Sequence, residues 1–104
     1  MKQLILSGVG PSGNIHIGNY IGAIKQWVNL QKDYENFFCV VDHHAITVRQ
    51  NPADLRAKSL EVAKLYFACG IDPEKSTVFI QSHVPAHTEL SWILGTITRV
   101  HEME

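Results

Sequence analysis

The chain divides into short apolar runs and longer stretches in which apolar residues recur at helical spacing. Three runs, at residues 3–7, 37–41 and 77–80, have the length of strands, and the second is apolar throughout, as in a strand covered on both faces. Three stripes with the period of one helix face follow these runs in turn. Their residues are Ile17, Ile21, Ile24 and Val28; Leu55, Val62, Ala63, Tyr66 and Phe67; and Leu90, Ile93, Leu94 and Ile97.

The order of these elements is βαβαβα, which predicts an α/β fold. We expect a parallel three-stranded sheet with helices on both sides and right-handed crossovers. The first helix should end near Lys32. The second should begin with Asn51 as its N-cap, followed by Pro52, and should end at Gly70.

Ligands of parallel sheets bind beyond the carboxyl ends of the strands. Residues 8–19, 42–48 and 81–87 meet that condition, and the first of these segments is the most informative. Its turn leaves backbone N–H groups unpaired beside the positive end of a helix dipole, where a phosphate is favoured. His16 and Asn19 add side-chain donors, and Gly18 leaves room for a flat group against the backbone.

Residues 8–13 also match G-x-G-x-x-G, the dinucleotide-binding fingerprint, and Asp42 ends the second strand, where a ribose-binding acid belongs. The spacing disagrees with this reading, because a second turn delays the helix and Pro11 stands where the helix should begin. A dinucleotide-binding domain of an oxidoreductase remains the alternative. A non-catalytic α/β segment that only associates is a third hypothesis.

Composition narrows the class of protein. The chain has 104 residues, 45% of them hydrophobic, which suits one small domain with a packed core. A formal net charge of −1 offers no basic surface for nucleic acid and no polybasic run for a membrane. Cys39 and Cys69 lie within apolar runs and read as reduced core residues, and no targeting or membrane-spanning segment is present, so we expect a cytoplasmic protein.

No structural metal is expected, because the cysteines lack ligand spacing and His83 and His87 straddle a proline. Asp42 could either orient a loop or contact a substrate. Three other predictions are that His43 is solvated, that His44 is either a buried, satisfied histidine or a pocket wall, and that Trp27 and Trp92 pack in the core.

The segment Pro11-Ser12-Gly13-x-x-His16-Ile17-Gly18-Asn19 resembles the HIGH-type signature of class I aminoacyl-tRNA synthetases. Residues 18–23, 41–48, 70–73 and 79–85 are similar to those of one family of this class, the bacterial tryptophanyl-tRNA synthetases. The resemblance covers essentially the whole chain. It implies a Rossmann-like domain, of which residues 1–104 would be the incomplete N-terminal half of the catalytic part.

The implied activity is that of a ligase of protein biosynthesis, which forms tryptophanyl-adenylate from tryptophan and ATP and transfers it to tRNA(Trp). Catalysis would rest on His16 and Asn19, and Mg²⁺ would arrive with ATP. The tryptophan pocket would be bounded by Leu6, Val41 and His44. The implied ATP-binding residues are Gly10, Ser12, Gly13, His16, Gly18 and Asn19.

Two positions depart from the family pattern. Asn19 replaces the last histidine of the generic motif, as is usual in this branch, whereas Gly10 stands where glutamine is common. The family's KMSKS loop, the acidic residue that reads the indole N–H, and the anticodon-binding helices are absent from this sequence, so tRNA would bind through parts not present here. The last apolar stripe would lack its cover, and we expect a homodimer or a larger oligomer with little charging activity.

Overall fold

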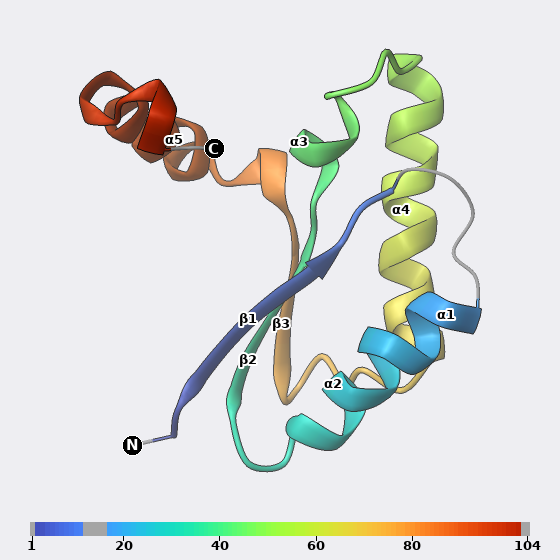
Figure 1. Ribbon diagram of the computed structural model, residues 1–104. Coiled ribbons are helices and arrows are strands. Elements are labelled where there is room, and N and C mark those ends of the chain that lie inside the picture. The colour runs from blue at the N-terminus through green and yellow to red at the C-terminus, as the bar shows by residue number, and fades with distance from the viewer. Residues whose placement is uncertain (1, 12–16, 103–104) are drawn as a thin grey trace.

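The computed structural model describes residues 2–11 and 17–102 (Figure 1). Strand β1 (Leu4–Val9) is followed by α1 (Ile17–Asn19), which continues through a π-helical segment, η1 (Tyr20–Ile24), into α2 (Lys25–Leu30). Strand β2 (Glu35–Val40), the short helix α3 (Asp42–Ala45) and the long helix α4 (Pro52–Ala68) come next. Strand β3 (Ser76–Ile80), the 3₁₀ turn η2 (Gln81–His83), α5 (Pro85–Ile97) and a last 3₁₀ turn, η3 (Val100–Glu102), complete the described chain.

The three strands form one parallel sheet in the order β1-β2-β3, which confirms the predicted fold class. Val9 lies opposite Val40, and Val40 lies opposite Ile80, so the carboxyl ends of all three strands meet at one edge. The strand bounds differ slightly from those predicted. The first strand runs two residues beyond Ser7, because the ladder to β2 continues through Gly8 and Val9.

The expectation of helices on both sides of the sheet is wrong for the described residues. Helices α2 and α4 pack on the same face, as Figure 1 shows. Two successive crossovers of the same hand, in a sheet whose strand order follows the chain, bring their helices to the same side. The opposite face carries Leu4 and Leu6, which are 61% and 60% exposed.

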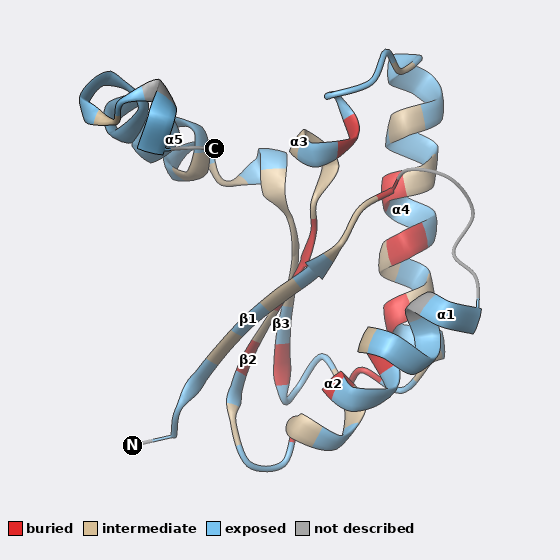
Figure 2. Cartoon of the chain, in the orientation of Figure 1, coloured by how far each residue is buried: buried red, intermediate tan, exposed pale blue. Residues whose placement is uncertain are grey.

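The core lies between that sheet face and the two helices, where the buried residues gather in Figure 2. Trp27 stacks on Phe38, with ring centroids 4.7 Å apart, and Tyr66 meets Trp27 edge-on at 5.2 Å. Each such aromatic pair stabilises the fold by about 0.5–1.5 kcal/mol beyond the contribution of the buried apolar area. Trp27 is therefore a core residue, as predicted.

The first predicted helix stripe is only half right. Ile24 is fully buried, but Ile17 and Ile21 are 75% and 55% exposed. The π-helical segment η1 explains the difference, because its wider turn changes which residues share a face. From this part of the chain, Ile24 and Trp27 are the residues buried in the core.

Helix α4 begins and ends as predicted. The Asn51 side chain accepts hydrogen bonds from the backbone N–H groups of Ala53 (2.9 Å) and Asp54 (3.4 Å), and Pro52 occupies the first turn. At the other end Gly70 has φ +108°, and the N–H of Ile71 donates to the carbonyl of Tyr66 at 3.1 Å. This is the Schellman ending, in which a left-handed glycine satisfies the last carbonyls of a helix.

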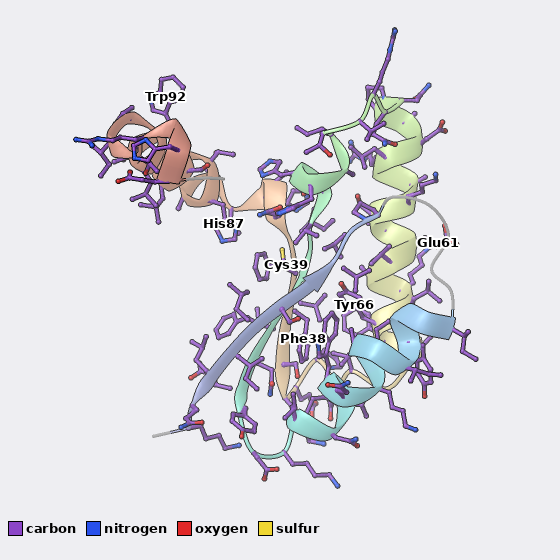
Figure 3. The ribbon with its side chains drawn as sticks, in the orientation of Figure 1. Phe38, Cys39, Glu61, Tyr66, His87 and Trp92 are labelled. Atoms are coloured by element: carbon purple, nitrogen blue, oxygen red, sulfur yellow. The ribbon has the colours of Figure 1, made fainter. Side chains whose placement is uncertain are left out.

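Helix α5 projects away from the sheet and the other helices (Figure 1), and apart from the half-buried His87 its residues are exposed (Figure 2). Its predicted stripe is uncovered in the described structure, with Ile97 74% exposed. Trp92, 76% exposed, points away from the helix, so its predicted core position is wrong (Figure 3). In the described part of the chain, no helix has both the length and the apolar character needed to cross a membrane.

Candidate functional site

The candidate site lies at the carboxyl edge of the sheet, where three different segments leave the strands. β1 leads into Gly10 and Pro11, β2 leads into α3, and β3 leads into η2. Pro11 is fully buried and Gly10 is half-buried, so the start of the first turn is held against the fold. This is the edge at which open parallel sheets bind ligands.

The nucleotide turn predicted from the sequence is only partly described. Ser12, Gly13 and His16 lie outside the described residues, and so does the side chain of Asn19. Gly18 is described and exposed within α1. The described flanks agree with a strand before the motif and a helix start after it, since β1 ends at Val9 and α1 begins at Ile17.

A buried tyrosine holds the strand ends from which this edge is built. The Tyr66 hydroxyl accepts a hydrogen bond from the N–H of Val9 at 2.9 Å and donates one to the carbonyl of Cys39 at 3.0 Å. Tyr66 is fully buried, and burial raises its pKa well above the ordinary value for tyrosine, so the hydroxyl keeps its proton. Helix α4 thus contacts β1 and β2 near their carboxyl ends through one side chain.

Val41 and Leu6, two of the predicted tryptophan-pocket residues, lie on the same face of the sheet. A Cβ placed on Gly8 would be 2.9 Å from Val41 Cγ1, so Val41 lies on the side of the sheet to which a side chain at Gly8 would point. Leu6 precedes Gly8 by two residues in β1 and therefore points to the same side. This is the face opposite the helical core, and it leaves apolar surface open next to the strand ends.

His44, the third predicted pocket residue, lies in α3 and is exposed. The prediction that it could be a buried, satisfied histidine is therefore wrong. Its backbone N–H donates to the carbonyl of Val41 at 3.2 Å, so the backbone of His44 lies beside Val41 at the start of α3. His43, predicted to be solvated, is half-buried.

Asp42 connects the segments that follow strands β2 and β3. Its Oδ1 accepts a hydrogen bond from the backbone N–H of Ser82 at 3.0 Å, which ties the start of α3 to η2. From the sequence, Asp42 could either orient a loop or contact a substrate. The hydrogen bond from Ser82 is a loop-orienting contact. A cavity of about 400 Å³ opens beside it, and its lining includes none of Leu6, Val41 and His44. The cavity is lined by Asp42, Pro52, Leu55, Arg56, Ser59, Leu60, Ile80, Ser82 and His83.

The cysteines and histidines do not form a metal centre in the part of the chain that is described, where groups of three or more potential ligands are lacking. Cys39 is buried, and its burial together with the charge of Asp42 raises the pKa of the thiol to about 11, so it is neutral near pH 7. The ring of His87 packs edge-on against that of Phe79, with ring centroids 5.8 Å apart. The absence of a structural metal stays a prediction, which elemental analysis would check.

Sequence reasoning missed two residues of this edge. Tyr66 had been assigned only to an apolar stripe, although a buried tyrosine hydroxyl needs a partner, and that requirement was the available signal. From the sequence, Gly8 belongs to the candidate ligand-binding segment 8–19 and to the dinucleotide fingerprint at 8–13, and neither pattern indicates a close backbone contact. Its Cβ would lie 2.6 Å from the carbonyl oxygen of Cys39, so it is a position of close backbone approach.

Comparisons with known proteins are consistent with one family. The family model described as tRNA synthetases class I (W and Y) matches residues 2–104. A tryptophan–tRNA ligase of Clostridium tetani is 59% identical over 102 residues, which cover 98% of this chain and 30% of the relative. A tryptophan–tRNA ligase of Nostoc sp. is 57% identical over 103 residues, which cover 99% of this chain and 31% of the relative.

Solved structures agree with the sequence matches. The tryptophanyl-tRNA synthetase of Campylobacter jejuni, complexed with ADP and tryptophan, superposes with a TM-score of 0.88 at 41% identity, over 95% of this chain and 31% of that chain. The enzyme of Mycoplasma pneumoniae superposes with a TM-score of 0.93 at 30% identity, over 98% of this chain and 30% of that chain. The present chain therefore spans about a third or less of the length of these relatives.

Proposed function

Because this chain belongs to the class I tRNA synthetases (W and Y), we propose that it forms part of a catalytic domain that activates tryptophan with ATP and charges tRNA(Trp). The observation that carries the choice of tryptophan is the identity of 57–61% to tryptophan–tRNA ligases along nearly the whole chain. Membership of this family leaves the oxidoreductase alternative without support, because the G-x-G-x-x-G match at residues 8–13 falls within the matched segment.

In the proposed reaction, a carboxylate oxygen of tryptophan attacks the α-phosphorus of ATP. The bond from that phosphorus to the bridging oxygen breaks, pyrophosphate leaves, and tryptophanyl-adenylate forms. A terminal hydroxyl of the tRNA then attacks the acyl carbon, loses its proton, and releases AMP. Neither step needs a covalent protein nucleophile, so the protein's task is to position the substrates and stabilise charge on phosphate oxygens.

We propose that ATP binds where β1 ends, with His16 and Asn19 donating hydrogen bonds to its phosphates and Gly18 packing against the adenine. Gly10, Ser12 and Gly13 complete this set. Mg²⁺ would be held chiefly by phosphate oxygens and water. The support is the strand that ends before the motif, at Val9, and the helix that begins at Ile17, together with the ADP and tryptophan named for the Campylobacter jejuni relative.

We propose that the tryptophan ring lies on the open face of the sheet, bounded by Leu6 and Val41, with His44 at its edge. Gly8 supports this placement. Because it has no side chain, Val41 can lie close to the sheet, and space remains on the sheet surface beside Val41. The backbone contact between His44 and Val41 brings the third residue to the same place. We further propose a cytoplasmic homodimer that binds tRNA through parts beyond this segment.

The test is ATP–pyrophosphate exchange by a complete synthetase that carries this segment. The exchange should depend on tryptophan and should not be supported by tyrosine. His16→Ala should slow it about 10- to 100-fold, the effect of losing one charge-assisted hydrogen bond of about 1.5–3 kcal/mol. His101→Ala, at an exposed histidine in the last 3₁₀ turn, is the matched control and should leave the rate unchanged. An unaltered rate in His16→Ala would remove His16 from the site, and exchange without tryptophan would overturn the assignment.

A further inference from the structure

Helix α4 makes a polar contact with the strand end that leads into the proposed nucleotide turn. The Tyr66 hydroxyl accepts a hydrogen bond from the N–H of Val9 at 2.9 Å and donates one to the carbonyl of Cys39 at 3.0 Å. The register pairs Val9 with Val40, so in a parallel ladder the N–H of Val9 and the carbonyl of Cys39 belong to one rung near the carboxyl ends of β1 and β2. The hydroxyl contacts both partners of that rung.

The Tyr66 ring is held firmly, which makes its hydroxyl an effective tie. The side chain is fully buried, and its ring meets Trp27 edge-on at 5.2 Å, while Trp27 in turn stacks on Phe38 at 4.7 Å. Figure 3 shows Tyr66 between α4 and the sheet. A hydroxyl with so little freedom can hold the strand end in one position at low entropic cost.

We propose that Tyr66 is a positioning residue for the nucleotide, because its hydroxyl sets the end of β1 from which Gly10 and Pro11 depart. This inference rests on the proposed function, and it goes further by assigning a role to a residue that touches no substrate. A shift of about 1 Å at a substrate-positioning backbone is enough to slow a reaction greatly.

The wall of the tryptophan pocket should depend much less on this hydroxyl. The N–H of Val41 donates to the carbonyl of Val9 at 3.2 Å, and Tyr66 takes no part in that bond. Val41 also rests against Gly8 on the opposite face of the sheet from Tyr66. Removing the hydroxyl should therefore affect ATP more than tryptophan.

The test uses Tyr66→Phe in a complete synthetase that carries this segment. Phenylalanine keeps the ring packing and removes only the hydroxyl. We expect kcat/KM for ATP in pyrophosphate exchange to fall about tenfold, the effect of one lost hydrogen bond of ordinary strength, while KM for tryptophan changes less than about twofold. Hydrogen exchange at the amide of Val9 should become faster, a readout that does not depend on activity.

Val62→Ala is the matched control, because Val62 is a buried residue of the same helix that lies in the core and has no polar contact with the strands. It should lower the unfolding midpoint and leave KM for ATP unchanged at a temperature where the enzyme is folded. If Tyr66→Phe matches the wild type in kcat/KM for ATP and in Val9 exchange, or if Val62→Ala lowers kcat/KM for ATP equally, the positioning role is refuted. A wild-type enzyme without tryptophan-dependent exchange would instead refute the proposed function.

Discussion

Gly8→Ala tests the geometry of the candidate site at its narrowest point. The added Cβ would lie 2.6 Å from the carbonyl oxygen of Cys39 and 2.9 Å from Val41 Cγ1, where ordinary contacts begin at 3.4 Å. The strands would have to separate by about 0.8 Å at Cys39, and Val41 would have to move by about 0.5 Å. The Cys39 oxygen belongs to the backbone and accepts a hydrogen bond from the Tyr66 hydroxyl, so it cannot move without displacing other groups.

Overpacking of this kind costs about 1–3 kcal/mol of unfolding free energy. Since Val41 is the side chain displaced, KM for tryptophan should rise several-fold in a complete synthetase carrying this segment. Denaturant unfolding gives the first quantity and pyrophosphate exchange gives the second.

Gly95→Ala provides the control, because a Cβ at Gly95 in α5 meets nothing within 4 Å. It should leave the kinetics unchanged and stabilise the helix by about 0.5–1 kcal/mol. If Gly8→Ala behaves like Gly95→Ala in both assays, then the close approach at Gly8 does not shape the pocket, and the placement of Val41 on the open face is wrong.

Three further predictions concern the pocket, the buried thiol and the free helix. Val41→Arg should raise KM for tryptophan far more than KM for ATP, because an unpaired charge would fill an apolar site, and equal effects would place Val41 in the general core. The pKa of Cys39 is raised from 9.0 to about 11, so the folded state binds the thiol proton more tightly than the unfolded state does. The free energy of unfolding should therefore fall between about pH 9 and pH 11. A Cys39→Ala variant should lack this part of the decline. The exposed stripe of α5, with Trp92 76% exposed, should make this chain self-associate, and a clean monomer at tens of micromolar in sedimentation equilibrium would contradict that.

Local rules explain what the sequence predicted well. Asn51, Pro52 and Gly70 act on backbone groups within a few residues of themselves, so the bounds of α4 follow from its own sequence. The strands could also be predicted from local sequence, since a short apolar run such as residues 37–41 has few other ways to bury its side chains. The nucleotide motif was read from its residues and from a family resemblance, and part of it lies outside the described residues.

The remaining features depend on how distant elements meet. Ile17 and Ile21 keep the spacing of a regular helix, but the π-helical segment that exposes Ile21 is not visible in an apolar pattern. The partners of the Tyr66 hydroxyl come from two strands, and neither can be identified before the sheet is assembled. The one-sided cover of the sheet likewise follows from the direction of two crossovers rather than from any single residue.

A sheet whose strand order repeats its chain order has a consequence for how the molecule forms. Each strand finds its neighbour after a single crossover, so β1 and β2 can pair before β3 exists. Helix α2 joins these two strands, so the stacking of Trp27 on Phe38 can also form at this stage. Helix α4 then brings the hydroxyl of Tyr66 to Val9 and Cys39. Folding during synthesis, from the amino terminus onward, would therefore complete the strand end of the proposed nucleotide site early, with α4, and leave the open face for later contacts.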